Sequence, residues 1–139
     1  MKYLIDTNVV TEVMKPTPDQ KVIQWLDENE DDLVIDAIIL GEIYSGVKGK
    51  AEGRKRQLLE EWFRDYIVTD LPCLSWDSET SLVWGEMIAD LKKIGLNPTV
   101  KDSMIAATAK RYGLVVVTRN VKDFTGLGVE IFNPFEDLR

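Results

Sequence analysis

Four acidic residues, far apart in the chain, are candidates for a shared catalytic site. They are Asp6, Glu42, Asp102 and Asp123. The 139 residues include no histidine, and the single cysteine is Cys73, whose simplest interpretation is a small core residue. Ser-His-Asp catalysis, Cys-His catalysis and most zinc sites are therefore excluded. Any catalysis must use carboxylates, lysine, tyrosine or a hard metal ion held by oxygen.

Two of these acids also have a purely structural interpretation. Asp6 precedes a predicted helix and could be its N-cap, while Thr99 and Asp102 have the spacing of a capping box. As site residues, the first would end a strand and the second would project from the first turn of a helix. The small residues Ala106, Ala107 and Ala109 would let that helix pack tightly on a sheet and fix the position of Asp102.

The other two acids each have two possible interpretations. Glu42 has only Ile38, Ile39, Ser45 and Gly46 three and four positions away, so it has no charged partner on its own helix. It is either an exposed surface residue or an acid whose charge is balanced by a metal ion. Beyond residue 118 lie Asn120 and Asp123, either of which could reach the same region, or which could belong to a plain polar turn.

Alternating strands and helices must position these residues. Apolar runs predict strands over 2–6, 33–35, 67–69, 114–118 and 130–132, and helical spacing predicts helices over 8–15, 19–29, 38–47, 51–66, 77–94 and 99–112. This alternation predicts a single α/β domain over 1–139, with a mainly parallel sheet of about five strands and helices on both faces. Since open parallel sheets bind ligands at the carboxyl ends of their strands, the acids are expected at one edge.

Clustered carboxylates repel one another, and a hard divalent cation removes that repulsion. Mg²⁺ or Mn²⁺ prefers carboxylate oxygen. Such an ion lowers the pKa of a bound water and stabilises charge on phosphate. Hydrolysis of a phosphodiester is therefore the natural chemistry for this set of residues.

The net charge of -7 counts against a nucleic-acid substrate. Basic residues are nevertheless concentrated between 48 and 56 and again at Lys110, Arg111, Arg119 and Lys122, while the acidic run 27–32 is expected in solvent. No apolar run approaches the roughly 20 residues of a membrane helix. Asp6 interrupts the short apolar run at the N-terminus. We expect a cytoplasmic protein with no membrane segment.

Several motifs together resemble the PIN-domain signature. They are Leu4-Ile5-Asp6-Thr7-Asn8-Val9, Gly41-Glu42-Ile43, the segment from Asp102 to Ala109, and the segment from Val117 to Phe124. The closing Phe132-Asn133-Pro134-Phe135 is similar to the end of VapC-type toxins. The motifs follow the family's order and separations over nearly the whole chain.

This resemblance implies a three-layer α/β fold and a Mg²⁺- or Mn²⁺-dependent endoribonuclease that is the toxin of a toxin–antitoxin pair. It implies that Asp6, Glu42 and Asp102 bind the metal ion. Asp123 is ranked above Asn120 as the fourth group, because some relatives carry the acid at the later position. Thr7, Asn8, Thr118 and Asn120 are further polar groups that could orient ligands or water.

The resemblance also implies RNA as substrate, a homodimer, and an antitoxin segment in a groove beside the acids. Two other functions remain open. One is a PIN-like module that binds nucleic acid or partners without turnover, in which the acids are caps only. The other is a small-molecule phosphohydrolase, which is disfavoured because Asn8 stands where the common Asp-x-Asp motif has its second acid.

Overall fold

The computed structural model describes residues 1–136 and contains one sheet of parallel strands. In it β1 (Tyr3–Ile5), β2 (Leu33–Asp36), β3 (Cys73–Leu74), β4 (Val115–Val117) and β5 (Ile131–Phe132) lie in the order β3-β2-β1-β4-β5. All four strand pairings are parallel, with Leu4 opposite Val34 on one side and Val116 on the other. The prediction of a parallel α/β sheet of about five strands is confirmed.

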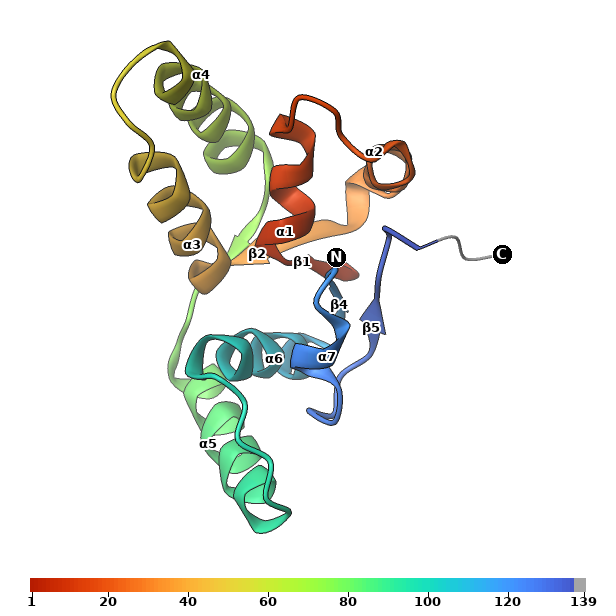
Figure 1. Cartoon of the computed structure of the whole chain (residues 1–139). Helices are drawn as coiled ribbons and strands as arrows, with labels where there is room; N and C mark the ends of the chain where they lie inside the picture. Colours follow the sequence, from red (N-terminus) through yellow and green to blue (C-terminus); the bar gives the residue numbers. More distant parts are fainter. Residues whose placement is uncertain (137–139) are drawn as a thin grey trace.

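Helices cover both faces of this sheet (Figure 1). The first half of the chain supplies α1 (Thr7–Val10), the 3₁₀ helix η1 (Thr11–Met14), α2 (Gln20–Glu28), the 3₁₀ helix η2 (Glu30–Asp32), α3 (Ala37–Lys48), α4 (Arg54–Trp62) and the π-helix η3 (Phe63–Val68). The second half supplies α5 (Ser78–Lys93), α6 (Val100–Tyr112) and α7 (Val121–Phe124). In Figure 1, α1 and α2 lie above the sheet, and α6 and α7 lie below it.

The core forms where these layers meet. Leu4, Ile35 and Val116 of the three central strands are fully buried, as is Ile39 of α3. Helix α6 buries almost one whole side, including Ala106 and Ala107, because side chains this small let a helix approach the sheet closely. That close approach fixes where the first turn of α6 lies, and Asp102 belongs to that turn.

The predicted third strand at 67–69 is wrong. Residues 67 and 68 belong to η3, which continues α4, and the strand that joins the sheet is β3 at Cys73–Leu74. Phe63 and Ile67 are both buried and are spaced four apart, as helical packing requires. This packing outweighs the strand preference of the short β-branched run. Cys73 is exposed rather than buried, because β3 is a two-residue strand at the edge of the sheet.

Smaller differences concern helix ends. The helix predicted over 8–15 begins at Thr7 and changes to 3₁₀ geometry at Thr11, before Pro16. The helix predicted over 51–66 begins only at Arg54 and becomes a π-helix at Phe63. Helix α7 was not predicted.

Within residues 1–136 no helix is long and apolar enough to cross a membrane. Residues 137–139 of the predicted domain lie outside the described residues.

Candidate active site

Asp6 follows β1 directly and forms the N-cap of α1. One carboxylate oxygen accepts a 2.9 Å hydrogen bond from the Thr7 backbone N–H, and the other accepts one of 2.8 Å from the Thr118 hydroxyl and one of 3.2 Å from the Asn8 side chain. Burial raises the pKa of Asp6, and the hydrogen bonds from Thr118 and Thr7 oppose that rise. The capping bond and a place in the site are therefore compatible.

Thr118 connects Asp6 to the carboxyl end of β4. The residue is fully buried, and its backbone N–H donates to the Phe132 carbonyl at 3.0 Å, which continues the pairing with β5. Its hydroxyl donates to Asp6 and accepts a 3.0 Å hydrogen bond from the Asn120 backbone N–H. Asn8 closes the network by accepting from the Arg119 backbone N–H at 2.9 Å. Two neighbouring strand ends thus hold one carboxylate in a single orientation.

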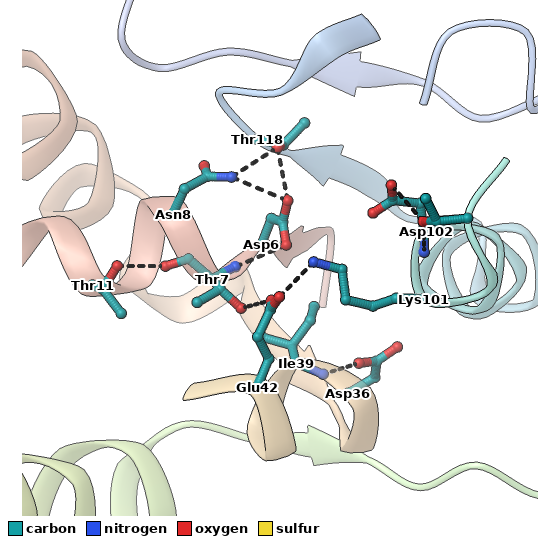
Figure 2. A network of polar contacts seen from close by, with 11 residues as sticks. Asp6, Thr7, Asn8, Thr11, Asp36, Ile39, Glu42, Lys101, Asp102 and Thr118 are labelled. Carbon is teal, nitrogen blue, oxygen red and sulfur yellow. Dashed lines mark hydrogen bonds and ion pairs between the residues drawn. The ribbon is translucent and has the colours of Figure 1, made fainter. Parts of the chain in front are cut away.

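Glu42 projects from α3 toward this network (Figure 2). One of its oxygens accepts a hydrogen bond from the Thr7 hydroxyl, and the other lies 2.5 Å from the Lys101 ammonium. The Glu42 side chain is 30% exposed, so it is neither a free surface group nor a buried one. The charged partner that its own helix lacks comes from α6.

Asp102 lies in the first turn of α6 and is buried. Its backbone N–H donates to the Thr99 hydroxyl at 3.2 Å, and that hydroxyl donates to the Asp102 carboxylate at 2.8 Å. Thr99 is therefore the N-cap that the spacing predicts, although the carboxylate binds the Thr99 hydroxyl and not its backbone N–H. As with Asp6, the cap holds the acid in place at the sheet edge.

The three acids face a common space without touching one another. Among residues 1–136, no three acidic side chains are gathered closely enough to hold a metal ion. Instead the Lys101 side chain extends among them (Figure 2), and the charges of Glu42, Asp102 and Asp6 all raise the pKa of Lys101, after its hydrogen bond to Glu42. The donor types suit a hard divalent cation, and the space between them already attracts a positive charge.

The fourth acidic position is less well connected. Asn120 is bound to the network through its backbone, because its N–H donates to Thr118. Asp123 lies one turn further along, in α7, and is exposed. Within the described residues its carboxylate makes no hydrogen bond or ion pair. The role of Asp123 as the fourth ligand stays a prediction.

Sequence reasoning missed a buried acid, Asp36. It ends β2 and caps α3 by accepting a 2.9 Å hydrogen bond from the Ile39 backbone N–H, but its other oxygen has no hydrogen-bond donor among residues 1–136. The side chain is 1% exposed, and burial raises the pKa of Asp36, with a smaller rise from the charge of Asp6. Its position at the end of a predicted strand was the available signal.

A groove of about 380 Å³ opens beside the acids, between α1 with η1, α3 and α4. Apolar side chains dominate its lining, and Thr7 and Glu42 of the site belong to it. The lysines that line it are Lys15, Lys50 and Lys55, all exposed. A larger hollow of about 820 Å³ lies around Tyr3, Trp25 and Phe132 and contains none of the predicted site residues.

The basic residues noted in the sequence have different roles. Arg111 is engaged with Asp77 and Glu79 and stacks on Tyr112, so it stabilises the packing of α6 on α5. Lys48 and Arg56 both pair with Glu60. The guanidinium of Arg119 lies 4.3 Å from the ring centroid of Phe135. Two residues of the basic run between 48 and 56, Lys50 and Lys55, line the groove beside Glu42.

Known proteins are similar in sequence to this chain over nearly their whole length. The chain is 32% identical to the toxin FitB of Neisseria gonorrhoeae, over 96% of this chain and 99% of that protein. It is 30% identical to the VapC ribonuclease Y4jK of Sinorhizobium fredii, over 96% and 97%.

Solved structures are also similar to this chain. The structure of FitAB bound to the IR36 DNA fragment matches with a TM-score of 0.91 at 30% identity, over 99% of this chain and 98% of that one. VapBC-5 of Mycobacterium tuberculosis, from the VapBC family of toxin–antitoxin systems, matches with a TM-score of 0.62 at 26% identity, over 73% and 81%. The PIN domain profile matches residues 3–127, so the chain belongs to the PIN-domain family.

Proposed function

We propose that the protein is a metal-dependent endoribonuclease and the toxin of a toxin–antitoxin pair. The observation that carries the proposal is the arrangement of Asp6, Glu42 and Asp102 around the Lys101 ammonium at the carboxyl edge of a PIN-type sheet, where the charges of all three acids act on that ammonium. Relatives of similar length are a toxin and a VapC ribonuclease. An RNA substrate would place the activity in the cytoplasm.

The three acids would hold Mg²⁺ or Mn²⁺. When bound, the ion supplies an activated water and stabilises negative charge on the phosphate. The chain's own residues fix the orientation of two of the three acids in advance, because Thr118 holds Asp6 and Thr99 holds Asp102. Glu42 is the adjustable member, since it is partly exposed and has two exchangeable partners.

We infer that the groove beside Glu42 receives a segment of the antitoxin. Its apolar lining, with Ile43, Val47 and Trp62, suits an apolar peptide face, and Lys15, Lys50 and Lys55 suit acidic side chains on the same peptide. A basic antitoxin side chain that extends from the groove to Glu42 would replace the positive charge of the metal ion. Inhibition should then be lost when that antitoxin residue becomes alanine.

The reaction is tested with purified, antitoxin-free protein and a defined RNA. Cleavage should require Mg²⁺ or Mn²⁺ and stop in excess EDTA. Its products should carry 5′-phosphate and 3′-hydroxyl ends, because an activated water attacks phosphorus. Cleavage that persists in excess EDTA would refute the metal requirement, and a cyclic phosphate product would mean that the RNA's own 2′-hydroxyl attacks.

A further inference from the structure

Lys101 is placed unusually for a residue of a metal-binding cluster. It precedes Asp102 in the first turn of α6, and its side chain extends to α3, where the ammonium lies 2.5 Å from Glu42 Oε2 (Figure 2). The chain therefore brings a positive charge of its own to the acids.

The contact is not an incidental surface pair. Lys101 interacts electrostatically with three carboxylates from three different elements, namely Glu42, Asp102 and Asp6. Conversely, Lys101 lowers the pKa of Asp6, against the opposing effect of Glu42. Its ammonium thus balances part of the charge that would otherwise destabilise the cluster.

We propose that Lys101 is a built-in counter-ion that occupies the cation position of the metal-free protein and is displaced when a divalent ion binds. The proposal rests on the metal centre of the proposed function. A divalent ion held by Glu42 would stand close to the Lys101 ammonium, and repulsion between the two cations at this range would favour the departure of Lys101. Lys101 can leave, since its side chain is 48% exposed on a flexible four-carbon stem.

Two consequences follow from this exchange. The metal-free protein has less carboxylate repulsion than it would have without Lys101, and divalent ions bind more weakly than the acids alone would allow. The Lys48–Glu60 pair between α3 and α4 provides a matched control, because its lysine is 41% exposed and also bridges two helices, at 3.5 Å.

The affinity test measures Mn²⁺ binding to the full chain by calorimetry, without RNA. Lys101→Met should bind Mn²⁺ about tenfold more tightly than the wild type, and its melting temperature without metal should fall. Lys48→Met should leave the Mn²⁺ affinity unchanged. Equal binding by wild type and Lys101→Met would overturn the displacement alone, whereas no binding by either would overturn the metal centre as well.

A second measurement separates displacement from a long-range charge effect. Chemical labelling of lysine amines, read residue by residue by mass spectrometry, should show Lys101 protected in the metal-free protein and faster to react at saturating Mn²⁺. Lys48 should react at the same rate in both. If the labelling of Lys101 does not change, the ammonium stays in place and the proposal is wrong, even if Lys101→Met binds the ion more tightly.

Discussion

At the scale of single residues, the acids of this site are held by hydrogen bonds that sequence patterns assign to helix capping. Asp6 and Asp102 are both N-terminal acids of helices, and both keep their capping contacts while they face the site. The structural and the functional interpretations of these residues are therefore not alternatives. A cap fixes the carboxylate, and a fixed carboxylate is what a preorganised site requires.

The fourth acidic position can be tested by exchanging charge between two neighbours. Asp123→Asn should lower cleavage by less than tenfold, because its exposed carboxylate has no contact with the network in the described residues. Asn120→Asp should raise cleavage or the affinity for Mn²⁺, since this position is joined to Thr118 by a hydrogen bond. Single-turnover rates at varied Mn²⁺ measure both effects. If Asp123→Asn lowered the cleavage rate as much as Asp102→Asn does, Asp123 would be a principal metal ligand.

Asp36 should reduce stability at neutral pH. Because burial raises its pKa, the folded protein holds the proton more tightly than the unfolded chain. The free energy of unfolding therefore falls as the pH rises from the unfolded to the folded pKa. Asp36→Asn keeps an N-cap oxygen and removes the charge, so it should raise stability at pH 7.5 by about 1–3 kcal/mol. Thermal melts at pH 4 should show a much smaller difference.

The matched control is Asp77, which caps α5 but is exposed and paired with Arg111. Arg111 holds the pKa of Asp77 well below its usual range, so Asp77 stabilises the fold at neutral pH and loses this effect on acidification. Asp77→Asn should therefore lower the melting temperature at pH 7.5. If both variants shifted the melting temperature in the same direction, charge burial would not explain the effect of Asp36.

At the scale of elements, the groove depends on how α3 faces α1, η1 and α4. Gly46 of α3 lines the groove, and a Cβ atom built there meets no other atom within 4 Å. Gly46→Gln should therefore leave the fold intact and slightly favour the helix, by up to about 1 kcal/mol, while it blocks the antitoxin segment. Inhibition by the antitoxin should weaken at least tenfold, with RNA cleavage retained.

Gly85 provides the control for that substitution. It lies within α5, outside the groove, and a Cβ atom built there also meets no other atom within 4 Å. Gly85→Gln should be inhibited like the wild type. Normal inhibition of Gly46→Gln would place the antitoxin segment elsewhere on the protein.

Local sequence signals predicted most elements, and they failed where packing decides. Alternation of apolar runs gave the parallel sheet, and Thr99 and Gly113 mark the ends of α6 as expected. The prediction of a strand at 67–69 was wrong because Phe63 and Ile67 pack as a helical pair. The partner of Glu42 could not be found locally, because Lys101 is 59 residues away. The buried state of Asp36 likewise depends on elements that meet only in the fold.

At the scale of the whole molecule, the net charge of -7 is compatible with the proposed RNA substrate, because the charge is unevenly distributed. The described surface places Lys15, Lys50 and Lys55 in the groove that ends at Glu42. A strand of RNA approaching the acids would meet these lysines. Local positive charge, more than net charge, governs the approach of a polyanion.

We expect a homodimer in solution. Large apolar side chains remain exposed on α3 and α4 and along the segment from α5 to α6, namely Tyr44, Leu58, Leu82, Ile94, Leu96 and Val100. Exposed apolar area of this kind marks surfaces that bind partners. Light scattering at micromolar concentration should give twice the mass of 15.8 kDa. A strictly monomeric protein would refute the dimer but not the nuclease, because all the acids come from one chain.

If acids at the sheet edge hold the metal ion that RNA cleavage requires, the loss of one carboxylate charge should stop cleavage, and a single-turnover assay with Mg²⁺ on Asp6→Asn and Asp102→Asn measures this. Each variant keeps the shape of the carboxylate and loses the charge that holds the ion. We predict a rate reduced at least 100-fold, with a metal-free melting temperature equal to or above that of the wild type because carboxylate repulsion is removed. A folded Asp6→Asn protein that cleaves RNA at the wild-type rate would show that these acids do not hold a catalytic metal ion.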